Sequence, residues 1–489
     1  MPIWAAKMEI PVKTITIDAR GRTHPFPHFW ERMFGSGRAI LSLRESYRKD
    51  MRSMKRITGF EYVRFHAIFH DEVGVYDEDK QGRPMYNFSY VDQIYDGLLE
   101  NKIRPFVELS FMPLKLASKN RRHSFWYKPI TAPPKDWGRW EDLVYQFARH
   151  LVERYGLVEV AQWYFEVWNE PNIDFWSGKP KSASYYELYD RAARAIKRVS
   201  RRLRIGGPAT SQAAWVDSFI KHCVERRVPV DFISTHVYAN DSAQNVLGTK
   251  EHVPRSEMIA RAARNVYSQV KLSALPDLPI FWTEYNASYT NEVNITDAPF
   301  MGPWLANTIR QCDGLVTMLS YWTFSDVFEE QGVVKQPFYG GYGLIAAGHI
   351  PKASYNAFKL LHRLGTKRIT VDSSSALATR RTDGSLAIAV WNYAPPDEEG
   401  SSQQIGLVIR NLTGSHRLRI HLLDRHHGSA LATWERMRRP RFPTPKQQRL
   451  LRASARLPPP KVKPLPRDGH VPDALDLPVH SLALIEIVR

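Results

Sequence analysis

Eight short apolar runs alternate with longer amphipathic segments over the first two-thirds of the chain, and this alternation constrains the fold more than any other feature. Each run is rich in β-branched and aromatic residues, as strands are. The runs cover residues 33–39, 60–69, 104–112, 163–170, 203–208, 231–238, 279–286 and 318–326. Segments of helical composition between them include residues 90–101, 137–155, 183–201, 213–225, 255–271 and 299–312. Eight strand–helix units favour an α/β fold, a parallel sheet closed into a (β/α)8 TIM barrel.

An open, doubly wound sheet of eight strands is the alternative to a barrel. Such sheets bind nucleotides through a glycine-rich loop directly after the first strand. At this position the chain has Gly35-Ser36-Gly37-Arg38, which lacks the spaced third glycine of that loop. We therefore favour the barrel.

The pattern changes after about residue 350. A last helix is predicted over residues 352–364, and short alternating runs typical of antiparallel strands follow it at 369–373, 376–380, 386–391, 405–412, 415–423 and 482–488. The N-terminal run 10–17 alternates in the same way and is expected to join them in an accessory β-sandwich. The predicted domains are thus an N-terminal strand in 1–20, a barrel in 21–350, and the last helix with the sandwich in 351–489.

Basic residues concentrate in one part of the chain, whose formal net charge is +18. Residues 431–467 hold eleven lysines and arginines against one acid, together with eight prolines, so +10 of that charge lies in 37 residues. We expect a solvated, extended excursion, with contact to an anion or a partner as the alternative. Only Trp434 and Phe442 could stack on bases there, so no nucleic-acid partner is predicted.

Several other function classes find no support in the sequence. No apolar stretch approaches the roughly 18 residues of a membrane span, and the start of the chain does not resemble an export signal, so a cytoplasmic protein is expected. Cys223 and Cys312 are expected to be buried thiols. No HExxH motif or cysteine cluster suggests a metal, and no cofactor is predicted. The oligomeric state stays open.

Two glutamates stand where a barrel keeps its catalytic groups, at the carboxyl ends of strands. Glu170 closes the fourth apolar run and Glu284 closes the seventh. In a ring of eight, these strand ends face each other across the barrel mouth. Paired carboxylates flanking one bond are the arrangement of glycoside hydrolysis, about 5–5.5 Å apart in retaining enzymes and about 6.5–9.5 Å apart in inverting ones.

Several motifs at separate strand ends carry a resemblance to a known family. They are Gly35-Ser36-Gly37-Arg38-Ala39, Arg64-Phe65-His66, Trp168-Asn169-Glu170-Pro171, Ser234-Thr235-His236-Val237-Tyr238, Trp282-Thr283-Glu284-Tyr285-Asn286 and the segment from Ser320 to Glu330. In this order they resemble glycoside hydrolase family 39 of clan A, which contains bacterial β-xylosidases and α-L-iduronidases. The match covers about residues 30–365 and fades in the basic C-terminal segment.

The resemblance implies that Glu170 is the acid/base and Glu284 the nucleophile of a retaining mechanism. It also makes Asn169 the donor to the sugar 2-hydroxyl. The residues support the first role independently, because Glu170 follows an apolar stretch and an acid catalyst needs a raised pKa.

Further substrate-binding residues are expected at other strand ends, namely His66, His236, Tyr238 and Trp322. Glu329 and Glu330, in the loop after the eighth run, resemble family residues that hold sugar hydroxyls. Tyr238 could orient Glu284, and Trp322 could form the floor under a sugar ring. Each could instead be ordinary core or, for the two glutamates, a solvated charge. Glu166 is predicted to be a buried structural acid paired with an arginine or a histidine. The aromatic loop 124–127 could wall the cleft or pack on itself, so no substrate contact is assigned to it.

The function predicted from these features is that of an exo-acting, retaining β-1,4-xylosidase that releases xylose from the non-reducing end of short xylo-oligosaccharides. An α-L-iduronidase, with Arg38, Arg64 or the basic segment binding the uronate, and an endo-acting relative are the alternatives. A non-enzymatic carbohydrate- or nucleic-acid-binding protein is less favoured, because both carboxylates are present.

Overall fold

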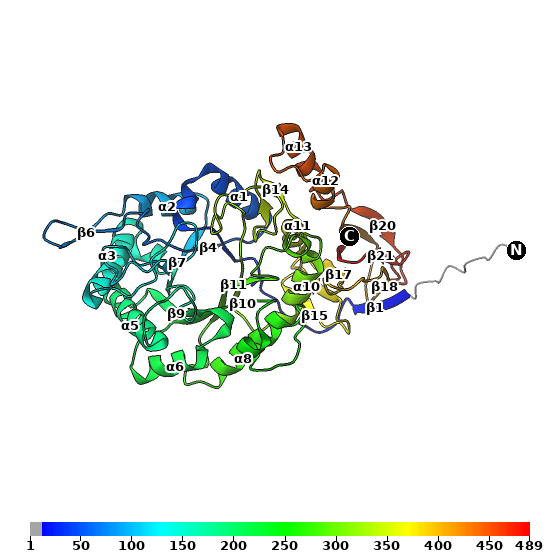
Figure 1. The fold of residues 1–489 in the computed structure, drawn as a ribbon. Helices are drawn as coiled ribbons and strands as arrows, with labels where there is room; N and C mark the ends of the chain where they lie inside the picture. The colour runs from blue at the N-terminus through cyan, green and yellow to red at the C-terminus, as the bar shows by residue number, and fades with distance from the viewer. Residues whose placement is uncertain (1–11) are drawn as a thin grey trace. The chain divides into compact units, whose positions relative to one another are not determined.

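The structure, a computed structural model, describes residues 12–489 (Figure 1). The chain forms two compact units. The barrel unit comprises residues 29–291 and 312–349, and the sandwich unit comprises 12–28, 292–311 and 350–489. Residues 21–28 and 292–311, which the predicted boundaries assign to the barrel, therefore cluster with the sandwich.

The barrel unit contains eight parallel strands that close in the order β3-β4-β7-β8-β9-β10-β11-β12. The strands are β3 (Met33–Gly35), β4 (Tyr62–Phe65), β7 (Arg104–Leu109), β8 (Tyr164–Val167), β9 (Arg204–Thr210), β10 (Phe232–Tyr238), β11 (Ile280–Asn286) and β12 (Met318–Tyr321). Each lies within one of the eight predicted runs or overlaps it. The (β/α)8 prediction is confirmed.

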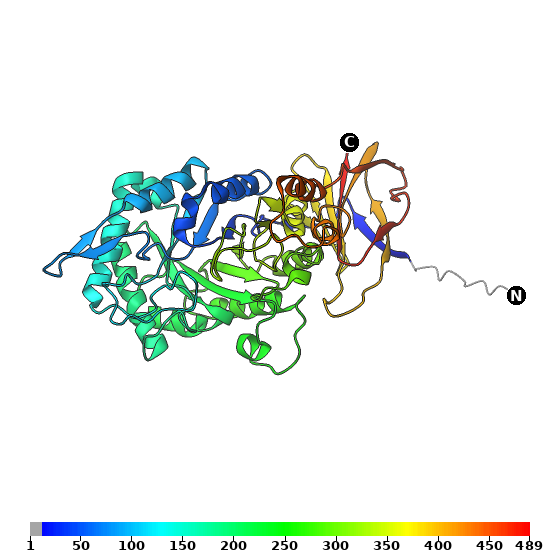
Figure 2. The same ribbon diagram turned by 45° about the horizontal axis from the view of Figure 1, so that its top comes forward.

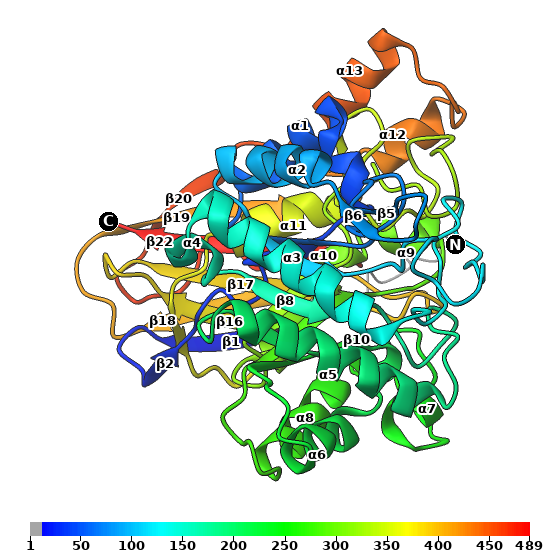
Figure 3. The ribbon, with the colours of Figure 1, turned by 90° about the vertical axis from the view of Figure 1, so that its left-hand side faces the viewer.

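Helices surround these strands (Figure 1). They are α1 (Glu45–Lys55), α2 (Ser89–Glu100), α3 (Trp137–Tyr155), α5 (Lys181–Val199), α6 (Val216–Glu225) and α8 (Met258–Lys271), with the short α4 (Leu157–Val160) and α7 (Ala243–Leu247). Helices α3 and α5 pack side by side (Figure 3). The hairpin of β5 (Tyr76–Glu78) and β6 (Pro84–Tyr86) projects from the unit (Figure 2).

Helix α3 shows how the sequence specifies these elements. Its N-cap is Asp136, whose side chain accepts hydrogen bonds from the backbone N–H groups of Gly138 and Arg139 at 2.8 and 3.1 Å. Its C-cap is Gly156, which takes a positive φ of 80° that glycine adopts readily. One face is buried at helical spacing: Trp140, Leu143, Val144, Phe147, Ala148 and Leu151.

Apolar side chains close the amino-terminal end of the barrel. They come from six strands and form one cluster: Met33, Tyr62, Phe106, Phe232, Phe281 and Met318, with Tyr164 packed against them. This layer fills one end of the barrel with aromatic rings. Polar groups of the interior are therefore gathered at the carboxyl ends of the strands, where a barrel enzyme keeps its active site.

The sandwich unit has a seven-stranded sheet, β2-β15-β16-β17-β22-β19-β20, and a three-stranded sheet, β1-β18-β21. These strands are β1 (Val12–Asp18), β2 (Thr23–Pro25), β15 (Lys367–Ile369), β16 (Ala376–Arg380), β17 (Leu386–Asn392), β18 (Gln403–Arg410), β19 (His416–Leu423), β20 (Lys461–Leu465), β21 (Leu475–Leu477) and β22 (Ser481–Val488). Ile17, Ile388 and Ile405 join one core between the sheets. The described part of the N-terminal run pairs with β18, in parallel, whereas antiparallel pairing was expected. Residues 10 and 11 of that run lie outside the described residues.

Of the other elements, β13 (Ile345–Ala346) belongs to the barrel unit. Most of the rest belong to the sandwich unit: α9 (Val293–Thr296), α10 (Met301–Cys312, up to residue 311), β14 (Ile350–Pro351) and α11 (Ala353–Leu361). Helix α11 is the predicted last helix, and it is shorter than expected. Cys223 and Cys312 are buried free thiols, as predicted. Among the described residues no helix combines the length and the apolar character needed to cross a membrane.

The prediction of an extended basic segment over 431–467 is wrong for much of its length. It contains helix α12 (Leu431–Arg436) and helix α13 (Pro445–Ser454). Helix α13 begins with a capping box, in which the Thr444 hydroxyl accepts from the Gln447 backbone N–H while the Gln447 side chain accepts from the Thr444 N–H. Pro445 stands at the first helical position, where its fixed φ favours a helix start.

Candidate active site

Two carboxylates and one imidazole meet at the carboxyl ends of the barrel strands. Glu170 follows β8, Glu284 lies near the end of β11, and His236 lies in β10. One carboxylate oxygen of each glutamate and one ring nitrogen of His236 all lie within 4.8 Å of one another. All three side chains are buried. The two glutamates that the sequence placed at opposite strand ends therefore form a close pair.

The backbone around Glu170 takes a conformation that non-glycine residues seldom adopt. Trp168 and Glu170 have φ angles of 72° and 43°. The Glu170 N–H donates to the carbonyl of Ala209 at 2.8 Å, and the Trp168 indole N–H donates to the carbonyl of Phe175, also at 2.8 Å. These bonds fix the turn, as the surrounding structure must wherever backbone strain is retained at a site.

Strand β11 has an irregular register at the second carboxylate. Thr235 pairs with Trp282, and the next residue of β10, His236, pairs with Glu284. Thr283 is thus an extra residue in the manner of a β-bulge, which redirects side chains. As a result two successive side chains contact groups of the barrel interior. The Thr283 hydroxyl donates to Glu166 at 2.8 Å, and Glu284 contacts Tyr238 and Arg64.

Arg64 connects the acids of the site. Its guanidinium is fully buried and donates to Glu166 Oε2 at 2.6 Å, Glu284 Oε1 at 2.7 Å and Asn169 Oδ1 at 3.0 Å. It also pairs with Glu108 at 2.8 Å. Burial opposes its charge, but the carboxylates around it raise the pKa of Arg64. The prediction that Glu166 is a buried structural acid paired with an arginine or a histidine is confirmed.

Both oxygens of Glu284 accept hydrogen bonds. Oε1 accepts from Arg64 and Oε2 accepts from the Tyr238 hydroxyl at 2.7 Å. Tyr238 is itself held by Asp241, whose carboxylate accepts the Tyr238 backbone N–H at 2.7 Å. Glu284 is therefore an oriented, ion-paired carboxylate. Tyr238 has the contact that the sequence suggested for it.

Glu170 has a different electrostatic environment. Burial raises the pKa of Glu170 to about 7, against the lowering effect of His66, Arg64 and a hydrogen bond to Ser211. Its Oε1 lies 3.0 Å from Nδ1 of His236. Burial lowers the pKa of His236 to about 4. At neutral pH the imidazole is thus uncharged, and Glu170 is poised near its titration midpoint, as an acid/base catalyst needs to be.

His66 and Trp322 lie beside the carboxylates. Nδ1 of His66 contacts Glu108 at 2.7 Å, its Nε2 lies 3.8 Å from Glu284, and its ring centroid lies 4.8 Å from that of Trp322. The Trp322 ring also passes close to Gly35. A Cβ on Gly35 would come within 2.1 Å of that ring, so only glycine permits this packing.

Glu329 and Glu330 are both nearly excluded from solvent, but they have different partners. Glu329 pairs with Arg38 at 3.3 Å and with Arg44, and these cations hold the pKa of Glu329 low despite its burial. Glu330 Oε1 lies 3.6 Å from Nε2 of His66. Burial, together with the other acids of the site, raises the pKa of Glu330 well above its usual value. The backbone N–H of Trp126 donates to the Glu330 carbonyl at 2.8 Å, so the aromatic loop borders this segment.

The structure therefore groups Asn169, Glu170, His66, His236, Tyr238, Glu284, Trp322 and Glu330, and it directs Glu329 towards two arginines. His70, which follows the second apolar run, contacts the Tyr127 carbonyl through Nε2 at 3.0 Å. Sequence reasoning missed Glu108, Thr283 and Asp241. Glu108 could have been found from its place near the end of the third apolar run, whereas nothing in the sequence distinguishes Asp241.

Glu170, His236 and Glu284 are close enough to hold a metal ion between them. The donor set argues against a cation. Arg64 Nη1 lies 2.7 Å from Glu284 Oε1 and would repel a metal at that oxygen. The second oxygen of Glu284 is already bonded to Tyr238. These residues fit proton transfer and nucleophilic chemistry better than metal binding.

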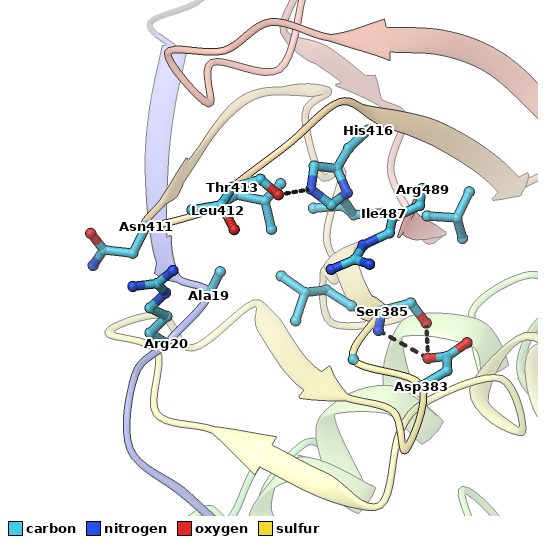
Figure 4. Close-up of a pocket in the computed structure, with 13 residues that line it drawn as sticks. Ala19, Arg20, Asp383, Ser385, Asn411, Leu412, Thr413, His416, Ile487 and Arg489 are labelled. Carbon is cyan, nitrogen blue, oxygen red and sulfur yellow. Dashed lines mark hydrogen bonds between the residues drawn. The ribbon is translucent and has the colours of Figure 1, made fainter.

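The sandwich unit has a separate hollow of about 450 Å³ (Figure 4). Its polar lining includes Arg20, Asn411, His416 and Arg489. Of the described residues that line it, Asp383 alone has an acidic side chain, and it is hydrogen-bonded to Ser385. A reaction that needs two facing carboxylates cannot be assembled there, so the barrel site is the candidate active site.

Comparisons with known proteins agree with this geometry. The family model of glycosyl hydrolases family 39 matches residues 13–472. A β-xylosidase of Geobacillus stearothermophilus is 37% identical over 444 residues, which cover 88% of this chain and 87% of that protein. A β-xylosidase of Caldicellulosiruptor saccharolyticus is 35% identical, covering 91% and 92% of the two chains. The crystal structure of a monomeric β-xylosidase from Caulobacter crescentus matches with a TM-score of 0.89 and 33% identity, covering 98% of this chain and 99% of that one.

Proposed function

The chain belongs to family 39 of the glycosyl hydrolases and is a glycosidase, and from this premise we propose that it is a β-xylosidase. Its reaction is the removal of xylose from the non-reducing end of short β-1,4-linked xylo-oligosaccharides. The observation that carries the proposal is the close pair of Glu170 and Glu284 in a chain 37% identical to a β-xylosidase.

We propose that the reaction proceeds with retention through two displacements. Carboxylate oxygens within 4.8 Å of each other suit the roughly 5–5.5 Å spacing of retaining enzymes better than the roughly 6.5–9.5 Å spacing of inverting ones. In the first step a Glu284 oxygen forms a bond to the anomeric carbon as the glycosidic C–O bond breaks. Glu170 transfers its proton to the departing oxygen.

The second step reverses these roles. Glu170, now ionised, takes a proton from water while the water oxygen bonds to the anomeric carbon and the Glu284 ester breaks. Esterification has by then removed the negative charge of Glu284, so the pKa of Glu170 falls between the steps and favours the ionised form. One residue can thereby act as acid and then as base.

The other grouped residues are assigned to the sugar. The Asn169 carbonyl oxygen is bonded to Arg64, which leaves its amide nitrogen to donate to the 2-hydroxyl. Trp322 offers a ring face to the C–H groups of the pyranose. His66, Glu329 and Glu330 have polar groups for the remaining hydroxyls, while His236 and Tyr238 orient the two catalytic carboxyls.

The arginines of the barrel favour a neutral sugar over a uronate. An α-L-iduronidase needs a cation for the substrate carboxylate, but Arg64 is fully buried among three acids. Arg38 is 5% exposed and pairs with Glu72 and Glu329. Both cations are therefore already neutralised, and a uronate would have to displace an existing ion pair.

Exo-action and a cytoplasmic location complete the proposal. A cytoplasmic enzyme would meet imported oligosaccharides rather than intact xylan, and two buried free cysteines are compatible with a reducing compartment. Cell fractionation with an antibody against the chain tests the location.

The substrate is tested with aryl glycosides and with xylohexaose. We expect release of nitrophenol from the β-D-xyloside at a rate at least about a hundredfold above that from the α-L-iduronide. The reason is that binding of the iduronide carboxylate would break an ion pair of Arg38 or Arg64, and loss of a charged pair costs several kcal/mol. From xylohexaose, free xylose and xylopentaose should be the first products. Faster cleavage of the iduronide, or xylotriose as the first product, would overturn the assignment.

A further inference from the structure

A continuous chain of hydrogen bonds lies behind Glu170. Its Oε1 is 3.0 Å from His236 Nδ1, and His236 Nε2 is 3.0 Å from the Thr283 hydroxyl. The hydroxyl continues to Glu166 Oε1 at 2.8 Å, and Glu166 Oε2 accepts from Arg64 at 2.6 Å. The four residues behind Glu170 are fully buried, so their hydrogen bonds are made with each other rather than with bulk water.

The direction of each bond follows from the ion pair at the far end. A carboxylate paired with an arginine only accepts, so the single hydrogen of Thr283 is given to Glu166. The Thr283 oxygen must then accept from His236, which places a hydrogen on Nε2. A neutral imidazole with Nε2–H has a lone pair on Nδ1. That lone pair faces Glu170, and the contact is a hydrogen bond only when Glu170 donates.

We propose that Thr283 is a positioning residue that holds His236 in its Nε2–H tautomer and thereby keeps Glu170 in the protonated form needed for the first step. Ionisation of Glu170 would set its charge against the Nδ1 lone pair. The alternative, moving the imidazole hydrogen to Nδ1, would forfeit the bond to Thr283. This inference rests on the proposed roles of the two catalytic glutamates and explains how Glu170 holds its proton to a higher pH than an exposed glutamate does.

Other groups also affect the protonation of Glu170, and the test must separate their effects from that of Thr283. The groups that face the Glu170 carboxyl or interact with it electrostatically come from several strands and loops: Arg64, His66, Glu108, Ser211, Tyr238, Asp241, Glu284 and Glu330. Arg64, His66 and the hydrogen bond to Ser211 favour the ionised form of Glu170, and burial and the neighbouring acids favour the protonated form. Substitutions at Thr283 leave all these groups in place.

The test compares Thr283→Val with Thr283→Ser. Valine has the shape of threonine but cannot accept the Nε2–H, so the imidazole is free to donate from Nδ1 to ionised Glu170. The alkaline limb of the kcat/KM profile, measured on nitrophenyl β-D-xyloside, should move down by about 0.4–1 pH unit, the equivalent of one hydrogen bond. Serine retains the hydroxyl, so the alkaline limb of the Thr283→Ser profile should stay at the wild-type position. Thr283→Ala removes the same hydroxyl and gives the same answer if valine does not fold.

Thr235→Val is the matched control. Thr235 is a buried threonine of the neighbouring strand β10, and its hydroxyl bonds to Thr210 rather than to any member of the hydrogen-bond chain behind Glu170. The Thr235→Val variant should lose stability without moving the alkaline limb of the kcat/KM profile. A folded Thr283→Val with an unmoved limb, or a serine variant shifted as far as valine, would overturn the proposal. Either result leaves the function intact if the wild-type protein hydrolyses the xyloside, whereas an inactive wild-type protein would refute the function itself.

Discussion

Replacing Glu170 by alanine should affect substrates according to their leaving groups. The buried carboxyl of Glu170, whose pKa is raised to about 7, is the group placed to protonate the departing oxygen. General acid catalysis contributes roughly 10²- to 10⁴-fold. For xylobiose, whose leaving sugar needs that proton, we expect kcat/KM to fall by about 10³- to 10⁴-fold. Dinitrophenolate departs from its xyloside without being protonated, so the first step with this substrate should be nearly unchanged.

The assay is stopped-flow release of dinitrophenol followed by addition of azide. Deglycosylation without the base should be slow, giving a burst of one equivalent per active site. Azide should enter the space vacated by the carboxyl and speed turnover. Because it enters on the face opposite Glu284, the product should be the β-xylosyl azide. Glu170→Gln, which leaves no such space, is the control and should not be rescued. An α-azide would refute the assignment of the two glutamates.

The acid/base carboxyl must be protonated for the first step, so kcat/KM should decline as pH rises through about 7, and a constant rate from pH 5 to 9 would contradict its role. Glu486→Gln should destabilise the sandwich unit by about 2–3 kcal/mol in urea unfolding at pH 7, because the pKa of Glu486 is lowered to about 2 by His421 and by Arg381 and Arg363. This stabilisation is present above the ordinary pKa and lost as pH falls through about 2, so an equal loss at pH 2 and pH 7 would contradict it. Gly35→Ala should displace the ring of Trp322, cost about 1–3 kcal/mol and raise KM, and unchanged kinetics would show that the ring does not bind the sugar.

The barrel was predictable because its strands are buried on both sides and read as continuous apolar runs. Helix α1 was missed although it buries Tyr47, Met51 and Met54 at helical spacing, because its charged residues dominate the segment. The basic helices were missed for a related reason. Their prolines suggested an extended chain, but Pro445 stands at a helix start rather than in an interior.

The site was predictable where it follows the rule of strand ends. Glu170 and Glu284 stand at these ends, and the structure brings their oxygens within 4.8 Å. Thr283 was not predictable from alternation, since neighbours in a regular strand point to opposite faces and only the irregular register of β11 lets Thr283 and Glu284 both contact the barrel interior. Asp241 acts on Tyr238 through a backbone bond, which leaves no side-chain pattern to detect.

The proposed mechanism requires Glu284 to form a covalent bond to the anomeric carbon of xylose. Incubation with an activated 2-deoxy-2-fluoro-xyloside, which slows both steps but the second more, tests it by mass spectrometry of the intact and digested protein. We expect one fluoroxylosyl group per chain, attached to the peptide that contains Glu284. Full activity with no adduct, or an adduct on Glu170, would contradict the nucleophilic role of Glu284.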